Sequence, residues 1–419
     1  MEDFAELLLF YLPLGILGLW RWGTWLMRRT SGWAYKPTPG QYHAEVSVVT
    51  PVYMEDPAVF RKAIQSWAAN KPTEIIAVID AADERCIAEF KAFGKSFPGA
   101  RLIVTEKPGK RPALADGARA AKGDIIAFAD SDTVWAPDLL EKALPPFAEK
   151  RVGGVATRQS VLQPSTASQR LFDIQLDLRF WDDMMPSAVM GNTFTCLSGR
   201  TALYRREAVL PLLDDLVNET FWGKQCIGGD DKRLTYLVEA AGWGTRYQHT
   251  ARVYTPGAAD MGTLFRQRTR WSRNSWRADL RAIGQGWVWK HPFLSFILVD
   301  RFISNLTLLF SLSYFFVSLA LGLWLPALIL AVWWLLSRSL RLTPNLAAHP
   351  ENFGIVPLYI ITNFALAFTR IFALFSLNCQ DWITRGLAKP GGSFGLLLAA
   401  MATSAVFAGV VLLVYSWRF

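Results

Sequence analysis

The sequence predicts an α/β domain with a mainly parallel, mixed sheet, inserted between transmembrane α-helices. Two observations lead to this fold class. The chain of 419 residues is 52% hydrophobic, which is too apolar for an ordinary soluble enzyme, and long apolar stretches lie toward its two ends. In its middle part, short β-branched runs alternate with helix-like stretches, a pattern typical of βαβ units. These runs cover residues 46–50, 75–80, 101–106 and 124–130.

Residues 1–30 predict an N-terminal transmembrane anchor. A cleaved signal peptide has positive charge before its apolar run and small residues after it. Here the order is reversed around the apolar stretch 4–20, so we expect an uncleaved anchor with its N-terminus outside and its arginines in the cytosol. The charged residues are Glu2 and Asp3 before the stretch and Arg21, Arg28 and Arg29 after it.

Residues 40–260 predict a cytosolic catalytic domain. In sheets built from βαβ units, ligands bind beyond the carboxyl ends of the strands. Three polar residues end predicted strands, namely Thr50, Asp80 and Asp130. These positions are therefore the first candidates for chemistry.

The remaining chain predicts amphipathic interfacial helices at 261–300 and a transmembrane region at 301–419. The expected spans are about 302–320, 322–337 and 394–416, and the last of these is long enough to cross a bilayer. Residues 353–378 are apolar but contain Asn363 and Arg370, and we expect them to lie in the interface. With that arrangement Arg338, Arg341, Arg385 and Lys389 all fall on the cytosolic side, as the positive-inside rule favours.

Charge and cysteine content narrow the function classes. The net charge of +9 indicates an anionic partner, such as anionic lipid or a phosphorylated substrate. Nucleic acid is not expected, because no nucleic-acid-binding motif is present and the basic residues lie beside apolar segments. The four cysteines have neither metal-ligand nor disulfide spacing, which fits a reducing compartment.

Acidic residues supply the first candidate site. Asp130 and Asp132 follow a hydrophobic strand and could share a hard divalent cation with a diphosphate, although acidic residues also end strands routinely. Asp80 could accept a hydrogen bond from a uracil N–H or a ribose hydroxyl, or simply form a strand-end turn. Asp231 could take a proton from an acceptor hydroxyl, or act as a helix cap with Asp230.

Basic and aromatic residues supply a second candidate site. Lys110 and Arg111 follow a Pro-Gly turn and precede a helix, which suits phosphate but also suits a solvated loop. Arg270 could meet a pyrophosphate and Trp271 could stack on a sugar, with Gln267 one turn before them. For most of the arginines around them, including Arg268, the composition favours the anchoring of an amphipathic helix to lipid. For Arg270 and Trp271, composition alone does not separate the two interpretations.

Taken together, the motifs resemble the family-2 processive glycosyltransferases, in the branch of hyaluronan, chitin-oligosaccharide and type 3 capsular polysaccharide synthases. The resemblance covers roughly Glu45 to Leu280. The motifs in chain order are Thr50-Pro51-Val52-Tyr53 with Glu55-Asp56, Asp80, Gly109-Lys110-Arg111, Asp130-Ser131-Asp132-Thr133, Ser198-Gly199, Gly229-Asp230-Asp231 and Gln267-x-x-Arg270-Trp271.

The resemblance implies a GT-A-type fold and an inverting mechanism with Asp231 as general base. Asp132 would bind Mg²⁺ or Mn²⁺, and Ser198 and Gly199 would lie at the acceptor. The implied nucleotide-sugar ligands are Thr50, Tyr53, Asp80, Lys110, Arg111, Asp130, Gln267, Arg270 and Trp271, the last also contacting the acceptor sugar. A gating loop at 381–385 would close over bound nucleotide through Trp382, Thr384 and Arg385.

The implied function is processive transfer from UDP-sugars to a polysaccharide that crosses the inner (plasma) membrane through a channel at 301–419. The donors would be UDP-glucose and UDP-glucuronate, or UDP-GlcNAc, and the chain could act as a monomer in the lipid bilayer. Arg200, where hyaluronan synthases usually have proline, favours the type 3 capsule-like branch. The alternatives are a non-processive glycolipid synthase and a catalytically silent membrane channel.

Overall fold

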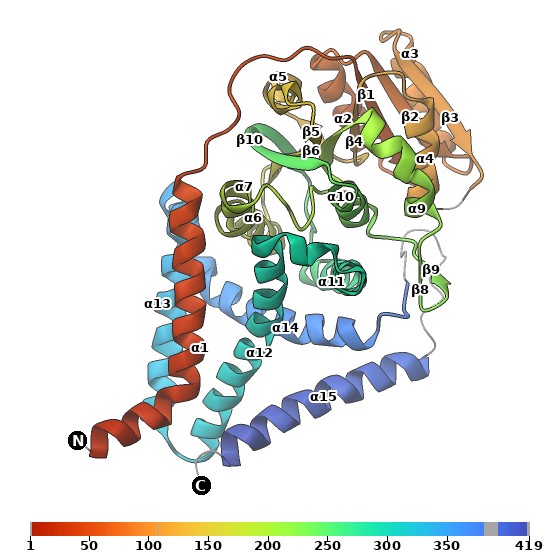
Figure 1. Ribbon diagram of the computed structural model, residues 1–419. Coiled ribbons are helices and arrows are strands. Elements are labelled where there is room, and N and C mark those ends of the chain that lie inside the picture. Colours follow the sequence, from red (N-terminus) through yellow and green to blue (C-terminus); the bar gives the residue numbers. More distant parts are fainter. Residues whose placement is uncertain (1, 108, 381–392, 417–419) are drawn as a thin grey trace.

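The computed structural model describes residues 2–107, 109–380 and 393–416 (Figure 1). An eight-stranded mixed sheet forms the centre of the catalytic domain, with strand order β3-β2-β1-β4-β7-β6-β10-β5. A separate two-stranded sheet pairs β8 (Thr220–Phe221) with β9 (Lys224–Gln225). The large sheet consists of β1 (Val46–Val52), β2 (Glu74–Asp80), β3 (Ala100–Thr105), β4 (Ile125–Ala129), β5 (Val134–Trp135), β6 (Val152–Val161), β7 (Thr201–Arg205) and β10 (Gly244–Thr255).

The first half of the sheet is parallel, as the sequence predicts. β1 pairs with β2 and β4, and β2 pairs with β3, all in parallel. Val48 and Val49 of β1 are both fully buried, on opposite faces, because helices cover the two sides of the sheet. The carboxyl ends of β1, β2 and β4 therefore meet at one edge.

The second half makes the sheet mixed. β7 runs antiparallel between β4 and β6, while β10 is parallel to β6 and antiparallel to β5. β7 follows the Ser198-Gly199 motif directly, so its antiparallel course brings that motif to the same edge as Asp130.

Helices surround the sheet and continue into the membrane part. Those of the catalytic domain are α2 (Pro57–Ala69), α3 (Glu84–Gly94), α4 (Lys110–Ala120), α5 (Leu139–Ala143), α6 (Ala167–Arg179), α7 (Met185–Met190), α8 (Arg206–Val209), α9 (Leu213–Val217) and α10 (Asp230–Ala240). A π-helical turn at Phe180–Met184 joins α6 to α7. The others are α1 (Glu2–Trp33), α11 (Met261–Gln285), α12 (Pro292–Ala320), α13 (Trp324–Ala348), α14 (Val356–Phe375) and α15 (Ser393–Ser416).

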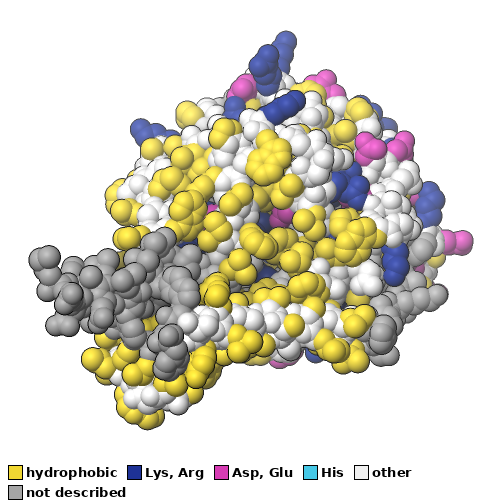
Figure 2. Space-filling view, turned by 60° about the horizontal axis from the view of Figure 1, so that its bottom comes forward, with side chains coloured by type: hydrophobic (Ala, Val, Ile, Leu, Met, Phe, Trp, Pro, Cys, Tyr) yellow, Lys and Arg dark blue, Asp and Glu magenta, His cyan; other side chains and the backbone are white. Residues whose placement is uncertain are grey.

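Four segments in the described part of the chain are long and apolar enough to cross a membrane: Pro292–Ala320, Trp324–Ala348, Pro350–Phe375 and Gly395–Ser416. Hydrophobic side chains dominate the lower face in Figure 2, where few charged groups interrupt them. The chain is thus a membrane protein whose helices lie on one side of the catalytic domain (Figure 1).

Two details refine the expected membrane segments. α12 begins at Pro292, ten residues before the span expected from the sequence, because its polar residues Asp300 and Arg301 are paired with Arg28 and Asp279. Residues 350–375 meet the length and composition of a span. In Figure 1, however, α14 lies across the direction of α1 and α13, directly beneath α11. Its interfacial position stays a prediction.

Candidate active site

The site is centred on the side chain of Lys110, at the first position of α4. Gly109 precedes it with a φ of +115°, a conformation that side chains other than glycine rarely adopt, and this turn directs α4 toward the strand ends. The Lys110 ammonium lies 2.6 Å from Asp130 Oδ1 and 3.0 Å from Asp230 Oδ2. Burial alone would lower the pKa of Lys110, but the surrounding carboxylates outweigh it and raise the pKa above its ordinary value. Lys110 therefore joins two acidic motifs that lie 100 residues apart in the chain.

Asp231 lies beside this cluster and contacts the Ser198-Gly199 motif. Its Oδ2 accepts a hydrogen bond from the Gly199 amide at 3.1 Å, and its Oδ1 accepts one from the Lys232 amide at 2.8 Å. Burial would raise its pKa, but Lys110 and these two amides lower it below the ordinary value. Asp231 is therefore a carboxylate at neutral pH, the form that can accept a proton.

Gly199 is tightly enclosed by Lys110, Asp130 and Asp231. A Cβ at this position would lie 3.1 Å from Lys110 Nζ, 3.5 Å from Asp231 Cβ and 3.6 Å from Asp130 Oδ1. A cavity of about 20 Å³ lies at this point between α4, β4, β7 and α10. Its lining includes Lys110, Asp130, Ser198, Gly199, Asp230 and Asp231. Six residues from four predicted motifs thus meet in one place.

Asp132 has surroundings that fit a divalent cation. Burial raises its pKa, and the nearby carboxylate of Glu55 raises it further, so a cation at this point would relieve two repelling negative charges. Ser131 donates a hydrogen bond to Glu55 Oε2 at 2.9 Å, which holds Glu55 at the motif. Among the described residues no group of three or more His, Cys, Asp or Glu could hold a metal by itself. An oxygen-only set of one or two carboxylates suits Mg²⁺ or Mn²⁺ that takes its other ligands from water and phosphate.

Arg270 on α11 faces the same carboxylates. Burial lowers its pKa below the ordinary value, and Asp230, Asp130 and Asp231 oppose that shift through their charges. Gln267, one turn earlier, has a buried Oε1 without a hydrogen-bond partner among the described residues. α11 thus brings the Gln267-x-x-Arg270-Trp271 motif to the carboxylate cluster.

Trp271 packs among cations and an aromatic ring. Its ring lies 5.9 Å from that of Phe172, and the guanidinium groups of Arg200 and Arg268 lie 5.3 and 5.1 Å from its centre. Burial and neighbouring arginines lower the pKa of Arg268 to about 9. These arginines bond to neutral glutamines, Gln159 and Gln175. Their position beside Trp271 could not be read from composition, which favoured lipid anchoring for Arg268.

Three of the expected nucleotide ligands, Thr50, Tyr53 and Asp80, lie outside the cavity around Lys110. Thr50 lies inside β1, which extends two residues beyond the expected strand, and its buried hydroxyl has no hydrogen-bond partner in the described chain. Tyr53 follows that strand, and Asp80 ends β2, where its Oδ1 accepts from the Ala82 amide at 3.0 Å in a strand-end turn. None of these three residues lines the cavity around Lys110.

Arg111 is turned into the protein, away from that cavity. Its guanidinium donates to Glu219 Oε2 at 2.7 Å, to the Leu216 carbonyl at 2.9 Å and to the Gly228 carbonyl at 2.8 Å. Glu219 also pairs with Arg233 and Arg281. The structure therefore gives Arg111 a structural position that fixes the backbone just before Gly229-Asp230-Asp231.

Sequence reasoning missed Asp279, a buried carboxylate behind the site. It lies 2.6 Å from Lys232 Nζ and 3.5 Å from Arg301 Nη1, and it accepts a hydrogen bond from the Tyr236 hydroxyl at 2.7 Å. It thereby ties α10, α11 and α12 together. Its sequence signal is only an aspartate within an arginine-rich helix.

The expected gating loop, with Trp382, Thr384 and Arg385, lies outside the described residues. The residue before it, Gln380, is described and accepts a hydrogen bond from the Ile227 amide at 2.8 Å. Arg277 of α11 donates to the Leu377 carbonyl at 2.9 Å. The chain thus enters the loop region next to the segment that leads into Asp230 and Asp231.

The fold and the site define a GT-A-like glycosyltransferase. A family model described as "Glycosyltransferase like family 2" matches residues 43–274, more than half of the chain, and the chain belongs to this family. An N-acetylglucosaminyltransferase of Rhizobium leguminosarum is 29% identical over 359 residues, covering 81% of each chain. A hyaluronan synthase of Streptococcus pyogenes is 26% identical, covering 84% of this chain and 86% of the relative. These similarities fit a processive family-2 synthase.

A solved structure supports the fold independently. A mannosyltransferase from Pyrobaculum calidifontis, in complex with GDP-Man and Mn²⁺, superimposes with a TM-score of 0.57 at 18% identity. It covers 87% of this chain and 98% of its own. At this identity the likeness bears on the fold, and it agrees with the GT-A-type architecture expected from the sequence.

Proposed function

We propose that this enzyme is a processive, inverting synthase that transfers sugars from UDP-sugar donors to a growing polysaccharide. It would work on the cytosolic side of the inner membrane and pass its product outward between its own helices. The observation that carries the proposal is the ion-pair network of Lys110, which joins Asp130 and Asp230 next to Asp231 and Gly199. The names of the relatives, N-acetylglucosaminyltransferase and hyaluronan synthase, support a polymerising enzyme.

The proton transfer falls to Asp231. Its carboxylate, held ionised by Lys110 and two amides, removes the proton from the acceptor hydroxyl. The hydroxyl oxygen then attacks the anomeric carbon on the face opposite the diphosphate, the bond from that carbon to the UDP oxygen breaks, and configuration inverts. UDP leaves with the bonding electron pair. One base is sufficient for this reaction, whereas glycoside hydrolysis requires a pair of carboxyl groups.

Cationic side chains stabilise the departing UDP. Lys110 on α4 and Arg270 on α11 both face the carboxylate cluster. When the donor is bound, their positive charges can bind the oxygens of its diphosphate. A bound Mg²⁺ or Mn²⁺ would be held by Asp132 together with Glu55 and would neutralise charge on the diphosphate oxygens. Asp130, Tyr53, Thr50 and Asp80 would position the nucleotide along the strand ends, with Arg111 supporting the site indirectly.

The acceptor would occupy the space bounded by Ser198, Gly199 and Trp271. Gly199 leaves room beside Asp231 for the reacting hydroxyl, since any larger side chain would approach Lys110 Nζ and Asp130 Oδ1. Gln267 Oε1 is buried without a hydrogen-bond partner among the described residues, and it can accept a hydrogen bond from a sugar hydroxyl or an amide N–H. Trp271 would stack on the terminal sugar, with Arg200 and Arg268 beside its ring.

The membrane arrangement that we propose has four spans, α1, α12, α13 and α15, with α14 in the interface. Trp276 of α11 donates to the Arg370 carbonyl at 2.9 Å, which holds α14 against the amphipathic helix. The same arrangement puts the loop at 381–385 on the catalytic side. Gln380, bonded to Ile227, is consistent with a loop that closes over bound nucleotide.

The test of this function is polymer synthesis by the purified protein in detergent. Radiolabelled UDP-GlcNAc, UDP-glucose and UDP-glucuronate are supplied singly and in pairs with Mn²⁺, and products are sized on a gel. A ladder that extends to high polymer supports the proposal and identifies the donors. A product of one added sugar that extracts with lipid would instead assign a glycolipid synthase.

A further inference from the structure

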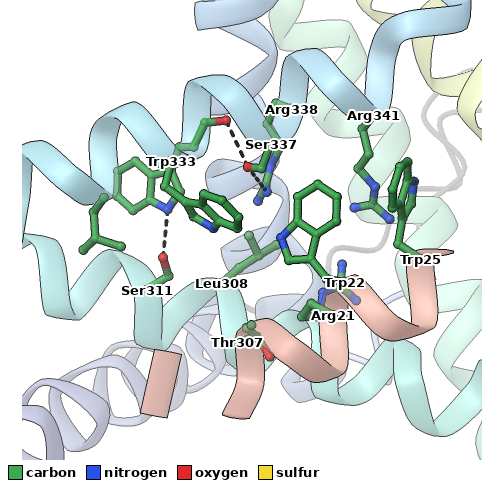
Figure 3. Close-up of a pocket in the computed structure, with 13 residues that line it drawn as sticks. Arg21, Trp22, Trp25, Thr307, Leu308, Ser311, Trp333, Ser337, Arg338 and Arg341 are labelled. Carbon is green, nitrogen blue, oxygen red and sulfur yellow. Dashed lines mark hydrogen bonds between the residues drawn. The ribbon is translucent and has the colours of Figure 1, made fainter. Parts of the chain in front are cut away.

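A second cavity, of about 110 Å³, lies between α1, α12 and α13 (Figure 3). It is several times larger than the roughly 10–15 Å³ that one water molecule requires. No residue that lines it also lines the cavity around Lys110. Its cationic and aromatic lining consists of Arg21, Arg338, Arg341, Trp22, Trp25, Trp333 and Trp334.

The charge around this cavity is not balanced by the protein. Five arginines of α1 and α13 share two carboxylates. Asp300 lies 2.6 Å from Arg28 and 3.6 Å from Arg21, and Asp182 lies 2.8 Å from Arg29 and 3.6 Å from Arg341. The fifth arginine, Arg338, bonds only to the Ser337 hydroxyl, at 3.2 Å, and no carboxylate in the described chain pairs with it. The cluster keeps an excess of three positive charges, which is costly beside apolar helices unless an anion is supplied.

Two buried donors that line the cavity also make no hydrogen bond. Trp25 Nε1 has no acceptor among the described residues, and Arg341 Nε has only its ion pair with Asp182 Oδ2 at 3.6 Å, which is too long for a hydrogen bond. In Figure 3, Arg338 and Arg341 extend from α13 toward the indole rings of Trp22 and Trp25 on α1. Guanidinium groups bind phosphate oxygens through paired N–H donors, and an indole N–H can add a further hydrogen bond. The lining is therefore complementary to a phosphate group.

The surface next to the cavity indicates that this phosphate belongs to a lipid. Trp333 lines the cavity and is 46% exposed, and the neighbouring residues of α13, Val332 and Leu336, are exposed apolar side chains. Acyl chains can lie along this surface while the headgroup enters between the helices. Basic pockets between membrane helices suit anionic headgroups in this way, and tryptophan is enriched at the same depth.

We propose that the cavity binds the phosphate of an anionic phospholipid and that this lipid stabilises the packing of α1 against α12 and α13. Binding of this lipid would also affect the catalytic domain, because α1 and α13 both contact it. Arg29 joins α1 to Asp182 in the π-helical turn before α7, and Arg341 joins α13 to the same carboxylate. A lipid that orders these two arginine-bearing helices thereby supports the segment that leads toward the Ser198-Gly199 motif.

The experiment uses the purified full-length protein in a neutral detergent. Its melting temperature is measured with added phosphatidylglycerol, phosphatidylcholine or inorganic phosphate at equal phosphate concentration. We expect phosphatidylglycerol to raise the melting temperature by about 2–4 °C, and the other two additions to leave it unchanged. Arg338→Gln should remove most of that rise, because it deletes a charge that pairs with no carboxylate and so leaves none orphaned.

Two further variants make the test specific. Lys290→Gln removes one exposed positive charge from the turn before α12, away from the cavity, and should keep the full rise. Gly18→Leu introduces a side chain at the cavity lining where an added Cβ meets nothing within 4 Å, so it should fill the cavity without disturbing α1. If Arg338→Gln does not fold, Gly18→Leu alone tests whether the cavity is the lipid site. A full rise in both Arg338→Gln and Gly18→Leu would overturn the site, and an equal rise with inorganic phosphate would overturn the lipid as its ligand.

Discussion

The amide of Gly199 donates a hydrogen bond to Asp231 Oδ2 at 3.1 Å, and this contact joins the Ser198-Gly199 motif to the start of α10. The two residues are separated by 32 positions in the sequence and come from different motifs. Their contact places the proposed base beside Gly199, where an added Cβ would lie 3.5 Å from Asp231 Cβ. The following predictions depend on this arrangement.

Asp231→Asn should lower sugar transfer by about 10²–10⁴-fold, because an amide cannot take the acceptor proton. UDP binding should remain, since the diphosphate is held by Lys110 and Arg270. Turnover is measured with radiolabelled donor and UDP binding by calorimetry. Asp214→Asn is the matched control, because the Asp214 side chain is 83% exposed on α9. Near-normal turnover in Asp231→Asn would show that Asp231 is not the general base.

Chelation should abolish activity, and Mn²⁺ or Mg²⁺ should restore it. Burial and the negative charge of Glu55 both raise the pKa of Asp132, so a cation there would relieve the repulsion between the two carboxylates and engage the diphosphate. Asp132→Asn should raise the Mn²⁺ concentration that gives half-maximal activity. Synthesis that continues undiminished in EDTA would show that the acidic pair does not act through a metal. Zinc should not substitute, because no cysteine–histidine cluster occurs among the residues described.

Trp382→Ala should slow elongation several-fold and leave the melting temperature unchanged, because a loop that closes over nucleotide contributes little to the core. Elongation is followed as product length against time. Trp289→Ala, which removes a half-exposed tryptophan from the turn before α12, is the control for loss of an indole. An unfolded Trp382→Ala protein, or one with wild-type elongation, would contradict a gating role.

Glu239 should make the stability of the domain depend on pH. Burial raises its pKa to about 8, while hydrogen bonds from the Phe194 amide and the Thr245 hydroxyl only partly oppose that shift. The folded protein therefore binds a proton that the unfolded chain releases above its ordinary pKa of about 4.3. This contribution to stability is complete below that value and is lost as pH rises through about 8.

Glu239→Gln isolates this effect, because the amide does not titrate. The melting temperature of the variant relative to wild type should rise between pH 5 and pH 8.5, whatever the constant cost of its buried amide. Glu141→Gln, at an exposed position on α5, should show no such trend. Parallel pH profiles for Glu239→Gln and wild type would show that Glu239 is ionised throughout.

Local pattern was sufficient for part of this fold and site. β1 to β4 and the Asp130 motif were predictable because β-branched runs and their polar ends are adjacent in sequence. The ion pair between Arg111 and Glu219 could not be predicted from the sequence, because the two residues are 108 positions apart and only the folded chain brings them together. The start of α12 was predicted too late for the same reason. A charged residue such as Asp300 indicates the end of an apolar span in the sequence, and only the structure shows that Arg28 pairs with it.

The central claim, that synthesis and export are coupled in one chain, is tested most directly in sealed membrane vesicles with the catalytic domain facing outward. Radiolabelled UDP-sugar is supplied outside, and polymer is digested from outside with and without detergent. The account predicts long polymer inside the lumen, protected until detergent is added. Products of a single added sugar, or long polymer found only outside the vesicles, would contradict it.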